Sequence, residues 1–499
     1  MTRDLLPVLD VGEIRALEAQ HAKEPLMERA GLAAAETARR MCGDRGGTIA
    51  ILAGPGNNGG DAFIAARWLR TWFHEVEVIF PGDVAALPAD AALAHHAFAA
   101  AGGSTLACPQ VSRPTLIVDG LFGIGLRRAL VEPYAGLVQW ANTAGAPILA
   151  LDTPTGLDAQ TGEARTPAIR AQATIAFVAL KPGLLTMDGP DHAGHIELAS
   201  LGLEAPPTTP GHCLHWPRLA QSVPTVLARR TRNVNKGTFG TLGILGGTEG
   251  MSGALILAGR AGMRMGAGKV WLGFLMANPP KFDTGMPELM LRPASFVLEA
   301  NPDALVIGPG LGMSDAARSL LQRALALPIP VALDADALNL IARDPSLLAA
   351  TNARTAPTLA TPHPGEAARL LQQDAATIGS DRIRAARELS RRLSACVVLK
   401  GAGSVLAYPD GTWDINASGG PALATAGSGD ILCGMLGAFL AQGIDSKSAL
   451  RLAVCLHGAA SDLLVERGTG PLGIAASELP DMARELLNKA TRESCVPSP

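Results

Sequence analysis

The feature of this sequence that most constrains its fold is a regular alternation along the chain. Short apolar runs that end in Gly, Asp or Pro alternate with Ala- and Leu-rich amphipathic segments, which is the pattern of βαβ units. It predicts an α/β fold with a mostly parallel sheet and helices on its faces. In the first half we expect a helical stretch and then five strands, near Val11–Met41, Thr48–Ala53, Val76–Phe80, Thr115–Asp119, Ile148–Asp152 and Ala173–Val178.

The length of the chain predicts more than one domain. Single cores stop growing at ~250–300 residues, and this chain has 499. The alternation fails between Leu203 and Pro224, where five prolines accumulate without periodicity. We therefore predict two domains, 1–215 and 229–499, joined by a Pro-rich linker at 216–228. In the second domain we expect strands near Thr241–Leu245, Lys269–Phe274, Ala304–Ile307, Val331–Asp334, Val397–Lys400 and Ser404–Ala407.

Charge and cysteine content exclude some classes of function. The net charge is −3, and no stretch gathers enough basic residues to follow a phosphate backbone, so we do not expect a nucleic-acid partner. The seven cysteines are odd in number and scattered, which favours reduced thiols and a cytoplasmic protein. We expect neither a leader nor a membrane helix, since Met1–Asp10 lacks an apolar core and no apolar run reaches ~20 residues.

A Gly-rich loop follows the first predicted strand. Gly54–Asp61 has the G-x-G-x-x-G spacing, and small residues at the start of a helix let a phosphate approach free backbone N–H groups. The second predicted strand ends at Phe80-Pro81-Gly82, without the acidic residue that binds the ribose in NAD-dependent dehydrogenases. Ordinary hydride transfer is therefore disfavoured. Taken alone, this loop could also be a tight turn with Asn capping the helix.

Two further loops begin with an Asp at the end of a predicted strand. They are Asp119–Leu126 and Asp152–Asp158. Ligands of open α/β sheets bind at this edge, so the three loops could hold a phosphate ligand, and their oxygens a hard cation. The alternative for a single Asp in this position is a helix cap.

These loops strongly resemble the N-terminal domain of the bifunctional NAD(P)H-hydrate repair enzymes, and the resemblance extends back to Leu26–Gly31. It implies a Rossmann-like domain that epimerises NADHX and NADPHX, the C6 hydrates of NADH and NADPH, with Asp152 as the catalytic residue. It implies a potassium ion held by Asn58, Asp119 and Thr155. The implied contacts to the hydrate are Asn57, Asn58, Gly59, Gly60, Asp61, Gly123, Ile124, Gly125, Leu126, Arg127, Arg128, Ala129, Tyr134 and Asp152. Ala62, Gly120 and Thr155 depart from the commoner family residues, which leaves the oxygen ligands intact.

In the second half, Thr425–Leu436 reads as a Gly-rich turn that enters a helix. The N–H groups of Gly427–Asp430 would form an anion hole for a transferring phosphoryl group, and Asp430 could accept the proton of the attacking hydroxyl. The alternative is that Asp430 only caps the helix. A Walker A loop is absent, because Met263 and Val270 stand where Gly and Ser or Thr belong around Gly268-Lys269.

Lys400–Ser404 follows an apolar strand, and its glycines would let a nucleotide lie against the backbone, although alone it could be a hairpin turn. With five further motifs, it makes this half similar to the ribokinase-like dehydratase domain of the same family; they are Asn235–Gly240, Ser252–Ala254, Gly308–Gly312, Asp334–Asn339 and Thr361–Glu366. The resemblance implies that Lys400, Gly401, Ala402, Gly403, Ser404 and Gly429 bind the nucleotide, and that Ala254, Gly310, Gly312, His363 and Asp430 face the hydrate, with Asp430 catalytic. By spacing alone, His363 would be an exposed loop residue. Asn235 replaces the usual His, which weakens the implied nucleotide contacts near it.

The resemblance implies two reactions, epimerisation of the R and S hydrates and ADP-dependent dehydration of the S hydrate to NAD(P)H, with AMP and phosphate released. The cofactors would be potassium and magnesium, with ATP as the other candidate donor. The partners would be NADHX, NADPHX and ADP, and we also expect a homo-oligomer. The alternative is a nucleotide-binding module fused to a small-molecule kinase, for example of a hydroxymethylpyrimidine. A metal site at His212, Cys213 and His215 is disfavoured, because no second ligand pair accompanies it.

Overall fold

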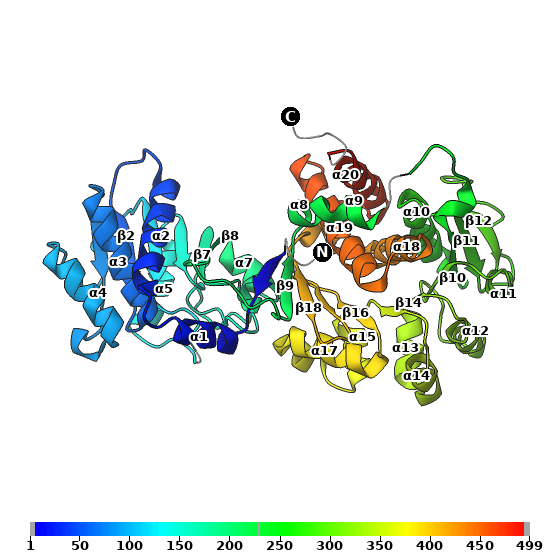
Figure 1. Ribbon diagram of the computed structural model, residues 1–499, viewed down its shortest axis with the longest axis horizontal. Coiled ribbons are helices and arrows are strands. Elements are labelled where there is room, and N and C mark those ends of the chain that lie inside the picture. Colours follow the sequence, from blue (N-terminus) through cyan, green and yellow to red (C-terminus); the bar gives the residue numbers. More distant parts are fainter. Residues whose placement is uncertain (1–4, 127, 228–229, 494–499) are drawn as a thin grey trace. The chain divides into compact units, whose positions relative to one another are not determined.

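The computed structural model describes residues 5–126, 128–227 and 230–493 (Figure 1). Contacts divide the chain into two compact units, one formed by Leu6–Gly211 and one that contains His212–Pro499. We call them the N-terminal and the C-terminal unit. Each contains a mostly parallel sheet flanked by helices, which confirms the predicted fold class.

The N-terminal unit contains a seven-stranded sheet of order β4-β3-β2-β5-β6-β7-β8, in which every pair is parallel. The strands are β2 (Ile49–Ala53), β3 (Val76–Ile79), β4 (Thr105–Leu106), β5 (Leu116–Gly120), β6 (Ile148–Leu151), β7 (Ala173–Phe177) and β8 (His195–Ala199); β1 (Leu6–Val8) precedes them. The strand order reverses between β2 and β5. Such a switch point opens a crevice at the carboxyl ends of the strands, and the loops predicted to bind ligand follow these strands.

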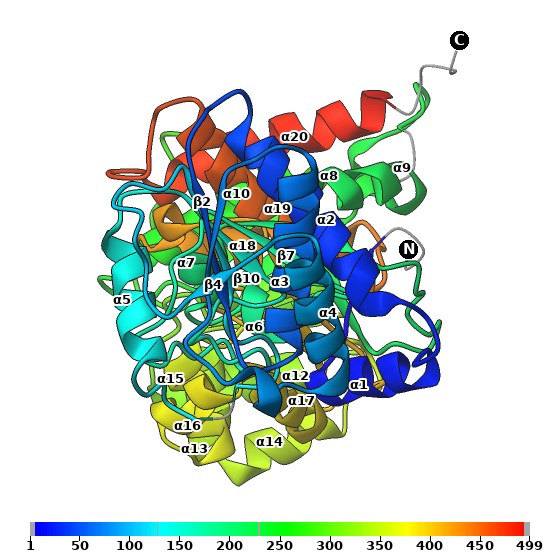
Figure 2. The ribbon, with the colours of Figure 1, turned by 90° about the vertical axis from the view of Figure 1, so that its left-hand side faces the viewer.

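The helices of the N-terminal unit cover both faces of this sheet (Figures 1 and 2). They are α1 (Val11–Gln20), α2 (Leu26–Cys42), α3 (Asn57–Thr71), α4 (Ala89–Ala100), α5 (Tyr134–Thr143), α6 (Pro182–Leu185) and α7 (Gly189–Ala193), with a 3-10 turn at Val84–Ala86. Alternate residues of β2 face opposite ways: Ile49 and Ile51 pack with α2–α4, and Leu52 packs with α5. We expected one helix at the start of the chain. The structure has two, α1 and α2, which are separated by the non-helical residues His21–Pro25.

The sheet of the C-terminal unit has the order β9-β18-β17-β16-β15-β14-β13-β10-β11-β12. Its strands are β9 (Gly211–Leu214), β10 (Thr241–Gly246), β11 (Lys269–Phe274), β12 (Met290–Pro293), β13 (Ala304–Ile307), β14 (Val331–Leu333), β15 (Thr358–Ala360), β16 (Cys396–Leu399), β17 (Val405–Ala407) and β18 (Trp413–Asn416). From β16 to β12 the strands are parallel, whereas β17 and β18 are antiparallel. The order reverses between β10 and β13, which again places a crevice at the carboxyl ends.

Helices also cover both faces of the C-terminal sheet, α8–α10 and α18–α20 on one side and α12–α15 and α17 on the other (Figure 1). The helices are α8 (Trp216–Leu219), α9 (Val223–Val226), α10 (Ser252–Arg264), α11 (Ala294–Glu299), α12 (Asp315–Leu325), α13 (Asp336–Arg343), α14 (Pro345–Asn352), α15 (Pro364–Leu371), α16 (Ala375–Ser380), α17 (Arg382–Leu393), α18 (Ser428–Ala441), α19 (Ser446–Glu466) and α20 (Leu479–Glu493). Four 3-10 turns lie at Ala220–Ser222, Lys236–Phe239, Pro421–Leu423 and Ala476–Glu478. Helix α19 is long and apolar enough to cross a membrane, but 78% of its apolar window is buried inside the protein, as in a core helix.

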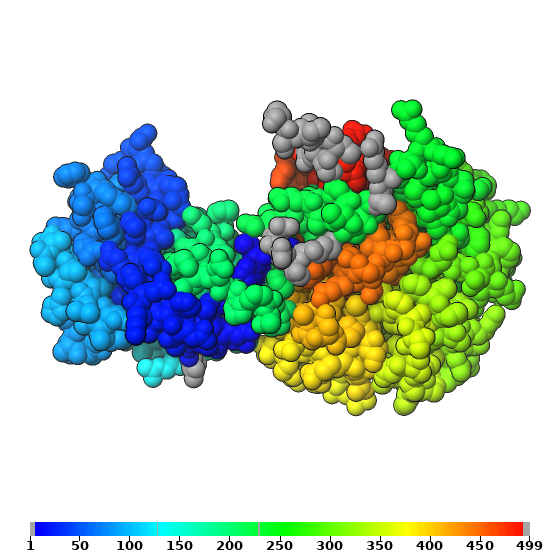
Figure 3. All heavy atoms as spheres, viewed as in Figure 1, coloured from blue at the N-terminus to red at the C-terminus, as the bar shows by residue number. Residues whose placement is uncertain are grey.

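The segment predicted as a linker, 216–228, is helical over Trp216–Leu219 and Val223–Val226. Trp216, Leu219 and Val223 are buried in the same core as α18 and α19, and in Figure 3 this green segment lies directly against the orange helices. Prolines start both helices at positions where a helix needs no N–H donor. The contacts of the chain divide it four residues earlier than the predicted domain end at 215, because β9 is a strand of the C-terminal sheet.

Candidate active sites

A cavity of about 1040 Å³ opens at the switch point of the N-terminal sheet. Eight of the predicted hydrate contacts line it, namely Asn57, Asn58, Asp61, Gly123, Ile124, Gly125, Leu126 and Asp152. The other predicted contacts among the described residues, Gly59, Gly60, Arg128, Ala129 and Tyr134, do not line it. Arg127 lies outside the described residues. The structure therefore brings the three predicted loops together around one cavity.

The glycines of the first loop have a packing role. A Cβ at Gly54 would lie 1.7 Å from the carbonyl oxygen of Leu121, and one at Gly59 would lie 1.9 Å from that of Gly54. Backbones this close leave no room for a side chain. The N-cap residue of α3 is Gly56, and no side chain caps the helix, so Asn57 and Asn58 do not have the capping role that the loop alone would allow.

The three residues predicted to hold potassium are all buried. The Thr155 hydroxyl donates a hydrogen bond of 2.7 Å to Asp119 Oδ1, and the Thr155 N–H donates one of 2.8 Å to Asp119 Oδ2. Burial raises the pKa of Asp119 to about 6, although these hydrogen bonds lower it. Both polar atoms of the Asn58 side chain are buried and have no hydrogen-bond partner among residues 5–126, 128–227 and 230–493.

Asp152 follows β6 and has a left-handed backbone, with φ of 65°. Its Oδ2 accepts a hydrogen bond of 3.3 Å from the N–H of Ile124, and its Oδ1 accepts one from Nζ of Lys181. Among the other carboxyl groups that line the same cavity are those of Glu18 on α1 and Asp61 on α3. Burial raises the pKa of both, and the charge of Asp152 raises it further. Sequence reasoning gave Glu18 and Lys181 no role, because neither lies in a recognised motif.

Tyr134 is the first residue of α5 and lies behind the cavity wall. Its ring packs edge to face against that of Phe122, which lines the cavity, with 5.0 Å between centroids. Burial raises the pKa of its hydroxyl. Arg128 and Ala129 are exposed. These three predicted contacts therefore lie beside the cavity.

In the C-terminal unit, Asp430 lies in the first turn of α18. Burial raises its pKa to about 6, and the nearby charge of Asp334 contributes, while Lys400 opposes the shift. The N-cap residue is Gly427, with φ of 88°, and no side chain caps the helix. The Ser428 N–H donates to the Thr425 carbonyl. The N–H groups of Gly429 and Asp430 have no partner within the described part of the chain and stay available for an anion.

Lys400 follows β16 and extends toward this helix. Its Nζ lies 3.0 Å from Oδ1 of Asp334, and a Cβ at Gly429 would be 3.4 Å from it. Burial lowers the pKa of Lys400, but Asp334 and Glu366 more than compensate and raise it to about 12. Lys400 is therefore cationic at the start of α18. Asp334 was part of a recognised motif but not a predicted site residue.

The Lys400–Ser404 loop is the hairpin between the antiparallel strands β16 and β17. The hydroxyl of Ser404 closes it by donating to the Gly401 carbonyl at 3.1 Å. Gly401 has φ of 146°, and a Cβ there would lie 2.5 Å from Nη1 of Arg382. Arg382 is buried at the start of α17, and its Nη2 donates to the Leu399 carbonyl at 3.2 Å. Sequence reasoning missed this arginine, because its contact with the loop depends on tertiary packing.

The remaining predicted contacts lie on neighbouring loops of the C-terminal unit. Gly310 has φ of 56° and lies against the Met251 carbonyl, which precedes the α10 turn that carries Ala254. The Gly312 N–H donates to Asp336 at 2.8 Å. His363 caps α15 by accepting the Gly365 N–H on Nδ1 at 2.9 Å. Burial and the charge of Lys400 lower the pKa of His363, so its ring is neutral near pH 7.

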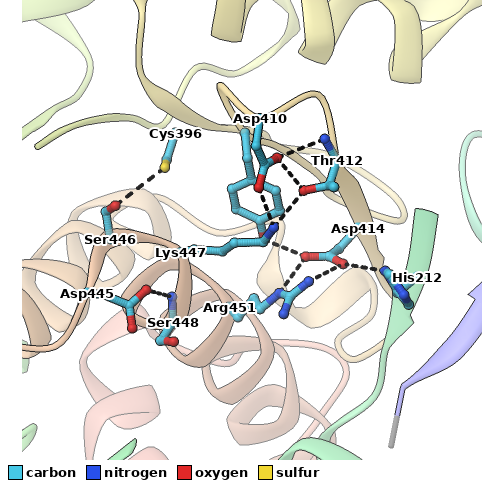
Figure 4. A network of polar contacts seen from close by, with 11 residues as sticks. His212, Cys396, Asp410, Thr412, Asp414, Asp445, Ser446, Lys447, Ser448 and Arg451 are labelled. Carbon is cyan, nitrogen blue, oxygen red and sulfur yellow. Dashed lines mark hydrogen bonds and ion pairs between the residues drawn. The ribbon is translucent and has the colours of Figure 1, made fainter. Parts of the chain in front are cut away.

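The residues of the disfavoured metal site serve other purposes. Among the described residues, no group of three or more His, Cys, Asp or Glu could hold a metal ion. His212 points toward Asp414, with 3.6 Å between Nδ1 and Oδ1, and Arg451 binds the same carboxylate with hydrogen bonds of 2.7 and 2.8 Å (Figure 4). Burial raises the pKa of the Cys213 thiol to about 12, so this thiol is not a ready metal ligand. Six cysteines, Cys42, Cys108, Cys213, Cys396, Cys433 and Cys455, are free thiols.

Comparisons with known proteins give the relatives of the chain. Residues 242–483 match the family described as NAD(P)H-hydrate dehydratase, and residues 23–183 match the family described as YjeF-related protein N-terminus. The bifunctional NAD(P)H-hydrate repair enzyme Nnr of Escherichia coli (strain K12) is 38% identical over 473 residues, which cover 93% of this chain and 89% of the other. The enzyme of the same name from Coxiella burnetii is 35% identical and covers 88% and 90%. A solved ADP/ATP-dependent NAD(P)H-hydrate dehydratase from Bacillus subtilis, co-crystallized with ATP/Mg2+, is 30% identical with a TM-score of 0.47, over 54% of this chain and 97% of its own. The chain thus belongs to the family of bifunctional NAD(P)H-hydrate repair enzymes.

Proposed function

We propose that the C-terminal unit dehydrates the S epimer of NADHX and NADPHX with ADP as the phosphoryl donor. The observation that carries this proposal is the position of Asp430, a half-buried carboxyl with a pKa of about 6, beside the ion pair of Lys400 and Asp334. A general base works best when its pKa lies near the working pH. Asp430 is therefore ionised at neutral pH and basic enough to accept the proton of a hydroxyl.

The reaction follows from these groups. Asp430 accepts the proton of the C6 hydroxyl while the hydroxyl oxygen attacks the terminal phosphorus of ADP, and AMP leaves. The free N–H groups of Gly429 and Asp430 and the ammonium of Lys400 stabilise the charge on the phosphoryl oxygens. Phosphate then leaves C6, a proton leaves the neighbouring carbon, and NAD(P)H is restored. ADP enters as its magnesium complex, as is usual in phosphoryl transfer.

We propose that the N-terminal unit interconverts the R and S epimers in the cavity at its switch point. Asp152 carries the proton-transfer chemistry, and its carboxylate lines the cavity beside Gly123 and Ile124. The loops around Asn57 and Gly123 bind the phosphates and the hydrated ring. The R hydrate is thereby converted into the S hydrate, which the dehydratase consumes.

The proposed potassium site has ligands of the right chemistry, and Asn58, Asp119 and Thr155 would hold the ion. All three offer oxygen atoms, which hard cations prefer, and the buried amide of Asn58 lacks a hydrogen-bond partner among the described residues. Such an unpaired buried amide is costly unless a ligand satisfies it. The bound ion would supply positive charge next to the phosphates of the hydrate.

The test is a product analysis. The protein is incubated with mixed hydrate epimers, with and without ADP or ATP, while the absorbance of reduced nicotinamide is followed. We expect complete recovery of NAD(P)H together with one AMP and one phosphate per hydrate when ADP is present. A stable phosphoester in place of NAD(P)H would refute dehydration and support the small-molecule kinase. Recovery that stops at the S fraction would refute epimerisation.

Three further properties remain proposals. The free thiols support a cytoplasmic protein, since such thiols persist in reducing compartments. We propose that the N-terminal and the C-terminal unit work as separate domains, the second of which includes 216–227. A homo-oligomer is also proposed, and sedimentation of the full chain would test it.

A further inference from the structure

Lys181 is a lysine whose side chain is completely buried, with an exposed fraction of 0%. It lies directly before α6, after β7. Its ammonium donates one hydrogen bond to Oδ1 of Asp152 and one of 2.7 Å to the Phe177 carbonyl. A buried ammonium is strongly destabilising unless it is paired. The pair with Asp152 therefore offsets the cost of burying the Lys181 ammonium.

Asp152 is held from two sides. Lys181 binds Oδ1, and the Ile124 N–H binds Oδ2 at 3.3 Å. Asp152 and Ile124 line the cavity, whereas Lys181 does not. Lys181 therefore acts on a bound hydrate through its contact with Asp152.

Two of the other acidic residues that line the cavity, Glu18 and Asp61, interact electrostatically with Asp152. Glu18 is half-buried and Asp61 is buried. Burial and the charge of Asp152 raise the pKa of each, while Lys181 lowers it. The other cation that acts on Glu18 is Arg15 of the same helix. Within the described part of the chain, Asp152 is the member of this group that has direct contact with an ammonium. This contact fixes the place of its carboxylate.

We propose that Lys181 is a positioning residue of the epimerase site, which fixes the Asp152 carboxylate toward the cavity. This inference rests on the proposed epimerase function. It adds a residue outside the predicted hydrate contacts.

The first test is Lys181→Met, which keeps the length of the side chain and removes its charge. We expect kcat for epimerisation to fall ~10²-fold, in the range of a lost general base. KM should change little, because Lys181 does not line the cavity. Lys23→Met, an exposed lysine of the same unit, is the matched control with wild-type values.

Asp152→Asn and the double variant Lys181→Met/Asp152→Asn complete a cycle. Since Lys181 acts through Asp152, the double variant should be no slower than Asp152→Asn, and it should melt at a higher temperature than Lys181→Met. Dehydration of pure S hydrate by the full chain reports that the protein is folded and active. Wild-type kcat in Lys181→Met, or additive losses in the cycle, would overturn the proposal.

Lys181→Arg keeps the positive charge but changes its position. This variant tests the positioning role if Lys181→Met does not fold. Positioning predicts a lower kcat and an unchanged KM. Wild-type kcat in this variant would contradict positioning. If neither the wild type nor Asp152→Asn alters the epimer ratio of added hydrates, the proposed epimerase function fails, which is distinct from failure of the role of Lys181.

Discussion

The carboxyl group of Asp430 lies where its ionised form is disfavoured. Burial and the charge of Asp334 raise its pKa from 3.8 to about 6, so the folded state holds this proton more tightly than the unfolded chain does. The penalty for ionising Asp430 in the folded protein therefore appears as the pH rises above 3.8 and is complete above about 6. A group with this titration loses its function as a base when the pH falls through about 6.

The first prediction concerns Asp430→Asn, which keeps the size of the side chain and removes the base. We expect dehydration of S hydrate to fall ~10²-fold or more, while epimerisation stays at the wild-type rate. The variant should melt at a higher temperature than wild type at pH 7.5, and this difference should shrink at pH 5, where the penalty fades. Near-normal dehydration would reduce Asp430 to a structural residue.

The second prediction concerns the cation. Asp119→Ala removes one of the three residues predicted to bind potassium. Only Asn58 and Thr155 of the predicted ligands then remain. Epimerisation by wild type should depend on potassium, with a higher KM when sodium or a bulky organic cation replaces it. Asp119→Ala should be slow in every salt. Equal epimerase rates for both proteins, with or without potassium, would refute the site.

Single residues also show the limit of sequence reasoning. Asp430 and Lys400 could be predicted because each stands in a recognisable Gly-rich motif. Lys181 meets Asp152 across 29 positions of the chain, and Arg382 meets Gly401 only after α17 has packed on the sheet. No local pattern marks such partners. Their roles depend on tertiary packing, which the local sequence does not encode.

At the scale of elements, the predicted strands agree closely with the structure. Lys269–Phe274 and Ala304–Ile307 have the predicted bounds, because each is an apolar run with clear ends. Strands such as β15 (Thr358–Ala360) and β18 (Trp413–Asn416) were missed. Both are short, and neither is a continuous apolar run, because Thr358 and Asp414 interrupt them. The break between α1 and α2 was missed as well, although Pro25 marks it.

The third prediction concerns the packing of two helices. Gly434 of α18 touches α10, and a Cβ there would lie 1.9 Å from the Ala258 carbonyl. Gly434→Ala should push the helices apart and destabilise the C-terminal unit by ~1–3 kcal/mol, as for an overpacked core. It should also slow dehydration, because α18 carries Asp430. Gly379→Ala is the control, since this helical glycine has open space around its Cβ position. Unfolding in urea measures both, and equal midpoints would contradict the prediction.

At the scale of the whole molecule, the domain boundary can be tested by cutting the chain. Trp216, Leu219 and Val223 are buried in the C-terminal core, and β9 is a strand of its sheet. A Pro-rich stretch with no periodicity gave no sign of this packing. The linker was predicted from composition, and composition alone cannot show where a segment packs.

The fourth prediction compares two forms of the C-terminal fragment. Residues 212–499 should fold and dehydrate S hydrate, whereas 229–499, which lacks β9, α8 and α9, should be less stable and prone to aggregate. The fragment 1–215 should equilibrate the epimers by itself. Thermal melts with the two activity assays measure this. Equal stability of 212–499 and 229–499 would show that the segment is a passive linker.

The position of both candidate sites at the carboxyl ends of parallel strands bears on how such a chain can change over generations. A strand such as β2 or β16 has one end that enters a ligand loop and another end that only supports the sheet. Substitutions at the supporting end are selected against only through their effect on stability. A compensating substitution elsewhere can restore that stability. Drift at the loop end alters catalysis directly, where no distant change restores a lost oxygen or carboxylate. Lineages of this protein should therefore accumulate differences on one edge of each sheet and keep the other nearly constant.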